Sequence, residues 1–309
     1  MLELSFQAWA VFIGLVIFLF TIDLLFGHRG SNLRAAVLWS AIWVGAGVAF
    51  GLWIWAVKGG EVAAAYYAAY VLEKSLSVDN IFVFVLIFSQ LRIPAHQQHR
   101  VLLLGIVGAL VMRALMIWGG VYLLQRFHWA IYPFAALLLF AAVRLLFGES
   151  TERRLVEESC AACTTWVARI IPVTPIADGQ RFLVRDNGKL MATPMFVALI
   201  LIETTDIIFA LDSIPAVLAI TRDPYIVYTS NIFALLGLRA LYFVLADVVQ
   251  RFHYLRPGLA VVLCFVAGKM LLTGIVDISV KVSLAVIVGI VLAAVAASWM
   301  FPKPKPAEH

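Results

Sequence analysis

The stretch Glu73-Lys74-Ser75-Leu76-Ser77-Val78-Asp79-Asn80 lies inside an apolar segment, 64–90, that is long enough to cross a membrane. A carboxylate at bilayer depth costs at least ~2.5–3.5 kcal/mol on insertion scales, so such residues are rarely without a role. A second apolar segment, 192–220, contains the matching run Glu203-Thr204-Thr205-Asp206 and, shortly after it, Leu211-Asp212-Ser213-Ile214. The two stretches predict a polar site in the middle of a membrane bundle.

The composition also indicates a membrane protein. Of the 309 residues, 63% are hydrophobic and 13% are charged, whereas a soluble globular protein is roughly 45–50% apolar and ~25% charged. Segments long and apolar enough for a transmembrane helix occur at 9–26, 33–57, 64–90, 101–124, 130–147, 192–220, 228–249, 258–275 and 279–301. The sequence therefore predicts an all-α fold, a polytopic membrane helix bundle with about nine transmembrane helices in the lipid bilayer.

The Lys and Arg residues between these segments predict the orientation, because cytosolic loops carry an excess of them. With the N-terminus outside, the outer loops carry only Lys58, Arg126, Arg222 and Lys281. The inner loops then carry Arg29, Arg34, Arg92, Arg100, Arg153, Arg154, Arg169, Arg181, Arg185, Lys189, Arg251, Arg256, Lys303 and Lys305. We expect an inner-membrane protein with its N-terminus outside and its C-terminus cytoplasmic. The net charge of +5 is interpreted as a topology signal, with no nucleic-acid partner.

The start of the chain and the cysteines give little further information about function. Because Glu3 and no basic residue precede the first apolar segment, a cleavable signal peptide is not expected. Cys160 and Cys163 lie in a predicted cytosolic loop, where thiols stay reduced. A Cys pair without further Cys or His nearby is half of a zinc site. We interpret the pair as small residues on an interfacial helix.

An internal repeat is the second strong signal. Val78-Asp79-Asn80-Ile81 matches Leu211-Asp212-Ser213-Ile214, Arg113-Ala114-Leu115 matches Arg239-Ala240-Leu241, Gln125-Arg126-Phe127-His128 matches Gln250-Arg251-Phe252-His253, and Arg144 matches Lys269. Since each copy holds three helices, the second copy must enter the membrane from the opposite side. Such inverted repeats are typical of secondary transporters, whose substrate site lies near the midplane between the repeats. A duplicated bundle without a transport role is the alternative.

These signals divide the chain into five parts. We predict two N-terminal transmembrane helices (1–62), repeat 1 (63–148), a cytosolic loop (149–190), repeat 2 (191–275), and a last transmembrane helix with a cytosolic tail (276–309). In the loop, apolar residues from Val156 to Ile170 recur at helical spacing, as in an interfacial amphipathic helix. Asp186-Asn187-Gly188 predicts a β-hairpin turn. A connecting role for the loop is favoured over a regulatory one.

Helical spacing defines the candidate site. Glu73 and Asn80 are seven residues apart, so both face the same side of one helix two turns apart, and Asp206 and Ser213 repeat this spacing. Pro215 frees a backbone carbonyl, and a broken turn at membrane depth is tolerated where it lines a cavity or packs against protein. The candidate metal ligands are Glu73, Asp79, Asn80, Glu203, Asp206, Asp212 and Ser213. Such all-oxygen donors suit Mg²⁺, Ca²⁺ or Mn²⁺ better than Zn²⁺ or copper.

Charge pairing inside the bundle is the alternative explanation for these acids. Five basic residues also fall within apolar segments: Lys74, Arg113, Arg144, Arg239 and Lys269. They are candidate charge partners or gate residues, because a lone buried acid would otherwise be protonated. Five acids on two repeat-related helices nevertheless exceed what pairing alone requires.

The stretch 73–80 and the run Glu203 to Pro215 resemble the signature motifs of the TerC/Alx family of integral membrane proteins, within a wider superfamily that includes LysE-type efflux proteins. The resemblance covers most of the chain, to about Gly274. It implies Mn²⁺ export, a response to alkaline pH or tellurite resistance, and it implies that the motif acids bind metal. The pair Cys160 and Cys163 is not part of the family pattern.

The sequence thus predicts an exporter of divalent metal cations, with Mn²⁺ favoured by the resemblance. No nucleotide-binding loop is evident, so exchange with protons is favoured over ATP hydrolysis. No bound cofactor is expected beyond the transported ion. An enzyme is disfavoured because no nucleophile–base pair accompanies the acids. A membrane scaffold or assembly protein linked to tellurite resistance is the other alternative.

Overall fold

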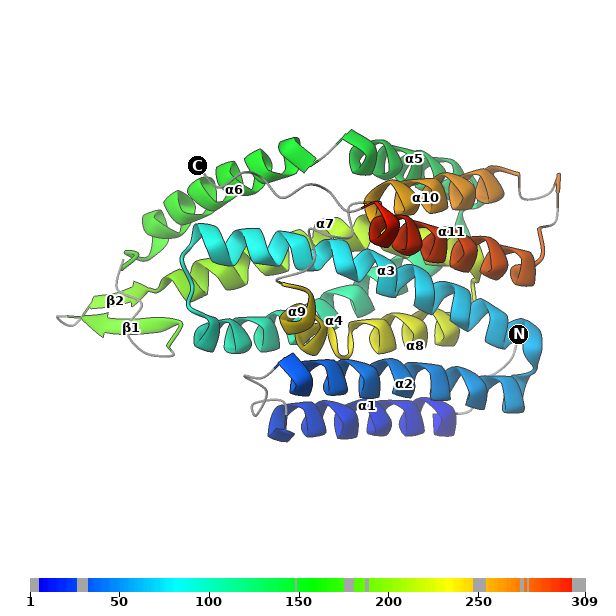
Figure 1. Cartoon of the computed structure of the whole chain (residues 1–309), viewed down its shortest axis with the longest axis horizontal. Coiled ribbons are helices and arrows are strands. Elements are labelled where there is room, and N and C mark those ends of the chain that lie inside the picture. The colour runs from blue at the N-terminus through cyan, green and yellow to red at the C-terminus, as the bar shows by residue number, and fades with distance from the viewer. Residues whose placement is uncertain are drawn as a thin grey trace.

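The computed structural model describes residues 6–26, 33–147, 149–174, 181–186, 189–246, 254–272, 275–276 and 278–301. The α-helices in these ranges are α1 (Phe6–Phe26), α2 (Leu33–Lys58), α3 (Gly60–Gln90), α4 (Ala95–Arg126), α5 (Ile131–Phe147), α6 (Glu149–Ile170), α7 (Pro194–Ile220), α8 (Pro224–Leu235), α9 (Leu238–Leu245), α10 (Leu255–Leu271) and α11 (Val280–Met300). Most of them lie along the long axis of the molecule (Figure 1). Every predicted apolar segment coincides with a helix or with the pair α8–α9, which confirms the all-α bundle.

The helices differ in how well they fit a membrane span. Four described helices are long and apolar enough to cross: Arg34–Lys58, Ala95–Arg126, Pro194–Ile220 and Val280–Met300. The bent pair α8–α9 makes a fifth if it counts as one span. Helix α3 is not among them although it has 31 residues, because charged residues occur along it: Glu61, Glu73, Lys74 and Asp79. The count of nine crossings stays a prediction.

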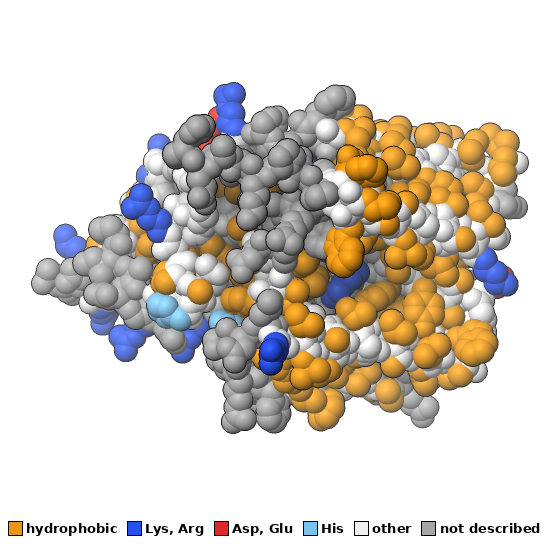
Figure 2. Space-filling model, in the orientation of Figure 1, with side chains coloured by type: hydrophobic (Ala, Val, Ile, Leu, Met, Phe, Trp, Pro, Cys, Tyr) orange, Lys and Arg blue, Asp and Glu red, His pale blue; other side chains and the backbone are white. Residues whose placement is uncertain are grey.

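The surface of the bundle is strongly apolar over one part. Large side chains such as Trp118 (67% exposed), Phe140 (65%) and Trp299 (82%) project outward. In Figure 2 hydrophobic side chains cover the right-hand part of the molecule, and most visible Lys and Arg side chains gather at the opposite end, around the hairpin. An exposed apolar surface of this extent fits contact with lipid.

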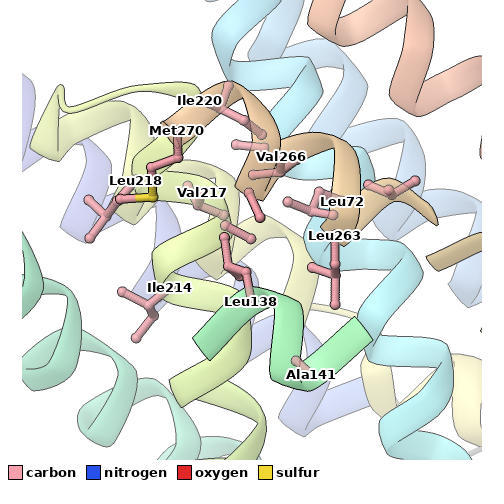
Figure 3. Close-up of a cluster of buried hydrophobic side chains, with 14 of the residues drawn as sticks. Leu72, Leu138, Ala141, Ile214, Val217, Leu218, Ile220, Leu263, Val266 and Met270 are labelled. Atoms are coloured by element: carbon pink, nitrogen blue, oxygen red, sulfur yellow. The ribbon is translucent and has the colours of Figure 1, made fainter. Parts of the chain in front are cut away.

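The core joins the two predicted repeats. Leu72 of α3, Leu138 of α5, Ile214 of α7 and Leu263 of α10 belong to one buried cluster (Figure 3). Small residues on α5 and α10, among them Ala142 and Ala260 in this cluster, are fully buried. Small residues let membrane helices approach closely, so this packing brings α5 of repeat 1 directly against α10 of repeat 2.

The predicted segment 228–249 is not one continuous helix. It is divided into α8 and α9, which bend by 41° at the break. Gly237 has φ +78° there, a conformation that L side chains rarely adopt, and a Cβ atom at this position would meet the Trp43 side chain. At Pro215 a broken turn was expected, but Pro215 lies inside the continuous helix α7.

The connecting segment contains a helix and a hairpin, as predicted. Helix α6 buries Val156, Cys160 and Val167 in a hydrophobic cluster with α3 and α7, whereas Ile170, at the end of the predicted apolar stripe, is 63% exposed. Strand β1 (Leu183–Asp186) pairs antiparallel with β2 (Lys189–Ala192). The turn residues 187–188, the landmark 250–253 and the tail from 302 lie outside the described residues.

Candidate metal-binding site

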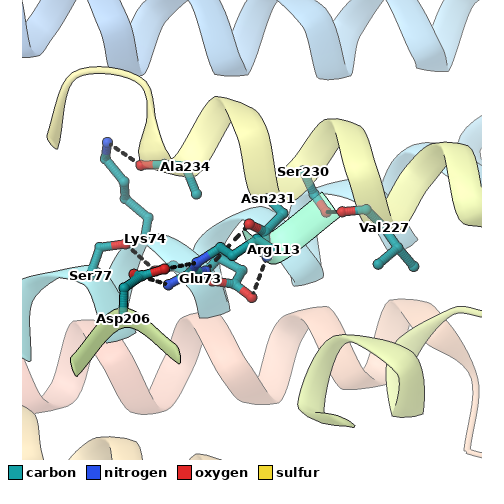
Figure 4. Close-up of polar contacts among 9 residues, drawn as sticks. All are labelled: Glu73, Lys74, Ser77, Arg113, Asp206, Val227, Ser230, Asn231 and Ala234. Atoms are coloured by element: carbon teal, nitrogen blue, oxygen red, sulfur yellow. Dashed lines mark hydrogen bonds and ion pairs between the residues drawn. The ribbon is translucent and has the colours of Figure 1, made fainter. Parts of the chain in front are cut away.

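The first group of predicted site residues forms a closed cluster around one arginine. Glu73 of α3, Arg113 of α4, Asp206 of α7 and Asn231 of α8 meet in the bundle interior (Figure 4), and none is more than 2% exposed. Arg113 Nη1 donates to Glu73 Oε2 at 2.7 Å. Its Nη2 and Nε donate to the two carboxylate oxygens of Asp206 at 3.2 and 3.3 Å. We call these four residues the Arg113 cluster.

Asn231 completes the Arg113 cluster. Its amide Nδ2 donates to Glu73 Oε1 at 2.7 Å, and its Oδ1 accepts from Arg113 Nη1 at 3.3 Å. Charged groups are tolerated at such depth when their hydrogen-bonding capacity is filled by partners. Both carboxylates are therefore engaged by protein groups, as the charge-pairing alternative expects.

Lys74 points away from the Arg113 cluster toward the broken helix (Figure 4). Its Nζ donates to the backbone carbonyls of Ala234 at 2.9 Å and Leu236 at 3.2 Å. These carbonyls lie at the C-terminal end of α8, where a helix break leaves backbone acceptors without amide partners. Lys74 therefore stabilises the break from the neighbouring motif helix, and its described hydrogen bonds go to backbone and not to a carboxylate.

The second group of predicted site residues surrounds a small cavity between α3 and α7. Asp79, Asn80, Asp212 and Ser213 line a space of about 20 Å³, enough for about one water molecule. Its other lining residues are Leu76, Arg113, Arg144, Leu145, Phe209 and Leu263. We call this space the aspartate cavity. The two motifs meet here through the residues that the predicted repeat makes equivalent.

Two arginines hold the aspartates of this cavity. Arg256 Nε donates to Asp79 Oδ1 at 2.7 Å, with the two side chains 15% and 8% exposed. Arg144 Nη2 donates to Asp212 Oδ2 at 2.9 Å, and here the side chains are 36% and 12% exposed. The arginines come from α10 and α5, so each aspartate is paired with the third helix of the other predicted repeat.

The donor set of the aspartate cavity fits a hard divalent cation. Two carboxylates, an amide and a hydroxyl face one space, and oxygen donors are what Mg²⁺, Ca²⁺ and Mn²⁺ prefer. Ser213 Oγ is buried there and has no hydrogen-bond partner among the described residues. Within the same residues, no three His, Cys, Asp or Glu side chains come together as a metal group. Any ion would therefore depend on Asn80 and Ser213 as well as on the two aspartates.

The remaining predicted residues are Glu203, Arg239 and Lys269. Glu203 is half-buried against Gly108 of α4, one turn from Asp206. Arg239 is 3% exposed on α9. Lys269, near the other end of α10 from Arg256, donates to Ser283 Oγ of α11 at 2.9 Å. Of the seven proposed ligands, two are in the Arg113 cluster, four line the aspartate cavity, and Glu203 lies near Asp206 without belonging to either group. Metal binding by any of them stays a prediction.

Sequence reasoning missed two residues of these groups. Arg256 was expected in a cytosolic loop, but it lies at the start of α10, which begins three residues earlier than the predicted segment. Asn231 was not singled out, although a polar residue within the apolar segment 228–249 was a usable signal. The acids were identified because acids occur at matching positions in the two predicted repeats. Neither Arg256 nor Asn231 has such a matching residue.

The fold and site define a helical integral membrane protein with buried ion pairs and a small cavity that two aspartates line. A model of the "Integral membrane protein TerC family" matches residues 58–305. The chain therefore belongs to the TerC family of integral membrane proteins. No solved structure matches it.

Individual relatives match nearly the whole chain. The chain is 47% identical over 301 residues to a Myxococcus xanthus protein named "Uncharacterized membrane protein STKORF319", covering 96% of this chain and 93% of that protein. It is 42% identical over 296 residues to the "Putative membrane-bound redox modulator Alx" of Escherichia coli K12, covering 92% and 91%. An "Uncharacterized membrane protein" of Rickettsia felis is 38% identical over 295 residues, covering 94% and 97%.

Proposed function

We propose that this protein exports divalent metal cations, with Mn²⁺ as the main substrate, across the inner membrane. The observation that carries the proposal is the aspartate cavity, where Asp79, Asn80, Asp212 and Ser213 from the two motifs meet in a membrane bundle. The preference for Mn²⁺ comes from the family resemblance, and the oxygen donors are compatible with it. As a carrier, the protein needs no catalytic nucleophile.

The proposed transport cycle uses the two predicted repeats as moving units. Helices α3 and α7 each carry one motif, and the cavity lies between them. Rocking of one repeat against the other would open such a site first to one side and then to the other. Protons arriving from the outer side would displace the ion, because a carboxyl group must be deprotonated to bind metal well.

The proposed direction depends on the orientation of the bundle. The exposed basic residues Arg92, Arg100, Arg154, Arg181, Arg185 and Lys189 lie on or near α6, the hairpin and the adjoining helix ends. The positive-inside tendency assigns this end to the cytoplasm. An ion would then enter the cavity from the end that carries α6 and leave from the opposite end.

A flux assay tests this function. Lipid vesicles that contain the purified protein are loaded with Mn²⁺, and Mg²⁺, Ca²⁺ and Zn²⁺ are then tested in turn as competitors. A pH gradient is imposed and the voltage is clamped. We expect Mn²⁺ to move in the direction opposite to the protons. Vesicles without the protein give the background. Flux that ignores the gradient would indicate a uniporter or channel, and absence of flux for every divalent ion would reject the transport proposal.

A redox role is the second candidate, suggested by the name of the Escherichia coli relative. The thiols on α6 are the residues to consider for redox chemistry. Burial raises the pKa of the Cys160 thiol to about 11, and the neighbouring Cys163 and Glu157 add to the effect. Since the thiolate is the reactive form, this environment favours an unreactive thiol. We therefore rank cation export first.

A further inference from the structure

The guanidinium groups of Arg144 and Arg256 contact the aspartates of the cavity where a bound cation would contact them. Arg256 donates to Asp79 at 2.7 Å and Arg144 donates to Asp212 at 2.9 Å. In both pairs the contact joins a carboxylate that lines the cavity to a guanidinium from a packed neighbouring helix. A guanidinium cannot lose its proton in a protein, so it can leave a carboxylate only by moving.

Both arginines reach the cavity from the same end of the bundle. Arg144 is in the last turn of α5, and Arg256 is the second residue of α10. Since α5 and α10 pack together and both arginines contact the cavity aspartates, the end of α5 and the start of α10 lie side by side. In Figure 1 these ends face α6. The arginines therefore lie between the cavity and the end with α6, the side from which the proposed ion enters.

The charges of the site balance in two ways. Two ionised aspartates carry a charge of −2, and two guanidinium groups neutralise it in the arrangement seen here. One divalent cation would neutralise the same two aspartates if both arginines withdrew. A monovalent cation would neutralise only one, and the other aspartate would keep its arginine. Because net charge at membrane depth is costly, this exchange favours a divalent ion.

Each guanidinium also has an alternative environment within reach. Arg256 Cζ lies 4.2 Å from the centre of the Phe82 ring, a contact that can hold a cation without a carboxylate. The Arg144 side chain is 36% exposed, so its charge can reach the surface at the end of α5. After leaving its aspartate, Arg256 would keep its contact with the Phe82 ring, and Arg144 would be exposed.

We propose that Arg144 and Arg256 are specificity-determining residues that act as tethered cations. They occupy Asp212 and Asp79 when no ion is bound, close the cavity from the α6 end, and are exchanged together for one divalent cation. This inference rests on the proposed function, because it assigns a role in the same site. It differs from simple structural pairing, in which the arginines never leave the aspartates and their loss does not improve ion binding.

The test compares Arg144→Gln and Arg256→Gln with the wild type in purified full-length protein, by Mn²⁺ titration in detergent with and without excess Na⁺. If the arginines occupy the aspartates about nine-tenths of the time, removing one raises the apparent Mn²⁺ affinity about tenfold. Na⁺ should compete measurably with Mn²⁺ in the variants and hardly at all in the wild type. Arg256→Lys keeps the charge and should restore the wild-type affinity.

Arg154→Gln is the matched control, because Arg154 forms an exposed pair with Glu158 on α6 at 2.8 Å. It should leave the affinity unchanged. If Arg256→Gln does not fold, Arg144→Gln decides the test, because its more exposed arginine is the less damaging to remove. Unchanged or weaker Mn²⁺ binding in a folded Arg→Gln variant, with normal transport by the wild type, overturns the inference alone. A wild type that binds no divalent cation overturns the proposed function as well.

Discussion

The Arg113 cluster and the aspartate cavity contain similar residues but are built differently. In the Arg113 cluster one arginine from the bundle centre engages two carboxylates, Asn231 completes the contacts, and every member is buried. In the aspartate cavity each carboxylate has its own arginine from a helix end, and a space of about 20 Å³ remains. The comparison shows that buried acids of one motif can serve two purposes. The closed cluster joins four helices, whereas the cavity leaves space beside its paired carboxylates, where we propose that an ion binds.

The largest expected effect concerns the closed cluster. Arg113→Gln should destabilise the protein by about 3–5 kcal/mol, because it leaves buried carboxylates without their charge partner. The measurement is thermal unfolding in detergent, with Arg154→Gln as the control, whose exposed pair should matter little. Arg113 also lines the aspartate cavity, so normal unfolding of Arg113→Gln together with lost Mn²⁺ binding would break the comparison, since Arg113 would then serve the transport site and not the stability of the bundle.

The next effect concerns the cavity itself. Asp79→Asn and Asp212→Asn keep the shape of each side chain and remove a charged ligand, so Mn²⁺ affinity should fall about 10–100-fold or more. Membrane insertion should remain normal, as judged from the amount of protein in the membrane fraction. Asp223→Asn is the control, because Asp223 caps α8 by accepting from Tyr225 N and Asn can do the same. Wild-type Mn²⁺ efflux in both cavity variants would reject the site.

A smaller effect concerns the helix break that brings Asn231 into the Arg113 cluster. Gly237→Ala should cost about 1–2 kcal/mol, because φ is +78° and Trp43 leaves no room for a Cβ atom. Gly119→Ala on α4 is the matched control, since nothing lies within 4 Å of its Cβ position. It should be neutral or slightly stabilising. Equal unfolding temperatures for the two variants would show that the break is not fixed by Gly237.

The smallest effect is expected on α6, away from both groups. The double variant Cys160→Ser and Cys163→Ser should leave Mn²⁺ flux unchanged, because the chemistry is assigned to the oxygen donors. In the wild type, alkylation of Cys160 should be slow near pH 7 and should accelerate as the pH rises toward its pKa of about 11. Loss of Mn²⁺ flux in the double variant would favour the redox role instead.

Helical periodicity predicted the elements well but predicted one site where the structure has two groups. Glu73 and Asn80 do share a face of α3, as their spacing requires. Seven residues of helix nevertheless span roughly 10 Å, so Glu73 reaches the Arg113 cluster while Asn80 lines the aspartate cavity. Spacing along one helix specifies the direction in which a side chain points around the helix axis. It does not specify which residues of other helices pack against that side chain.

The sequence alone determined that this chain is a helical membrane protein of the TerC family with acids in two similar motifs on two helices. Hydropathy and charge are sums over local segments, so they can be read without coordinates. Only the tertiary structure decided which cation each acid contacts: Arg113 for Glu73 and Asp206, Arg256 for Asp79 and Arg144 for Asp212. The reason is physical, since these partners are 40 to 177 residues apart in sequence. Their distances depend on how helices pack, which no local pattern specifies.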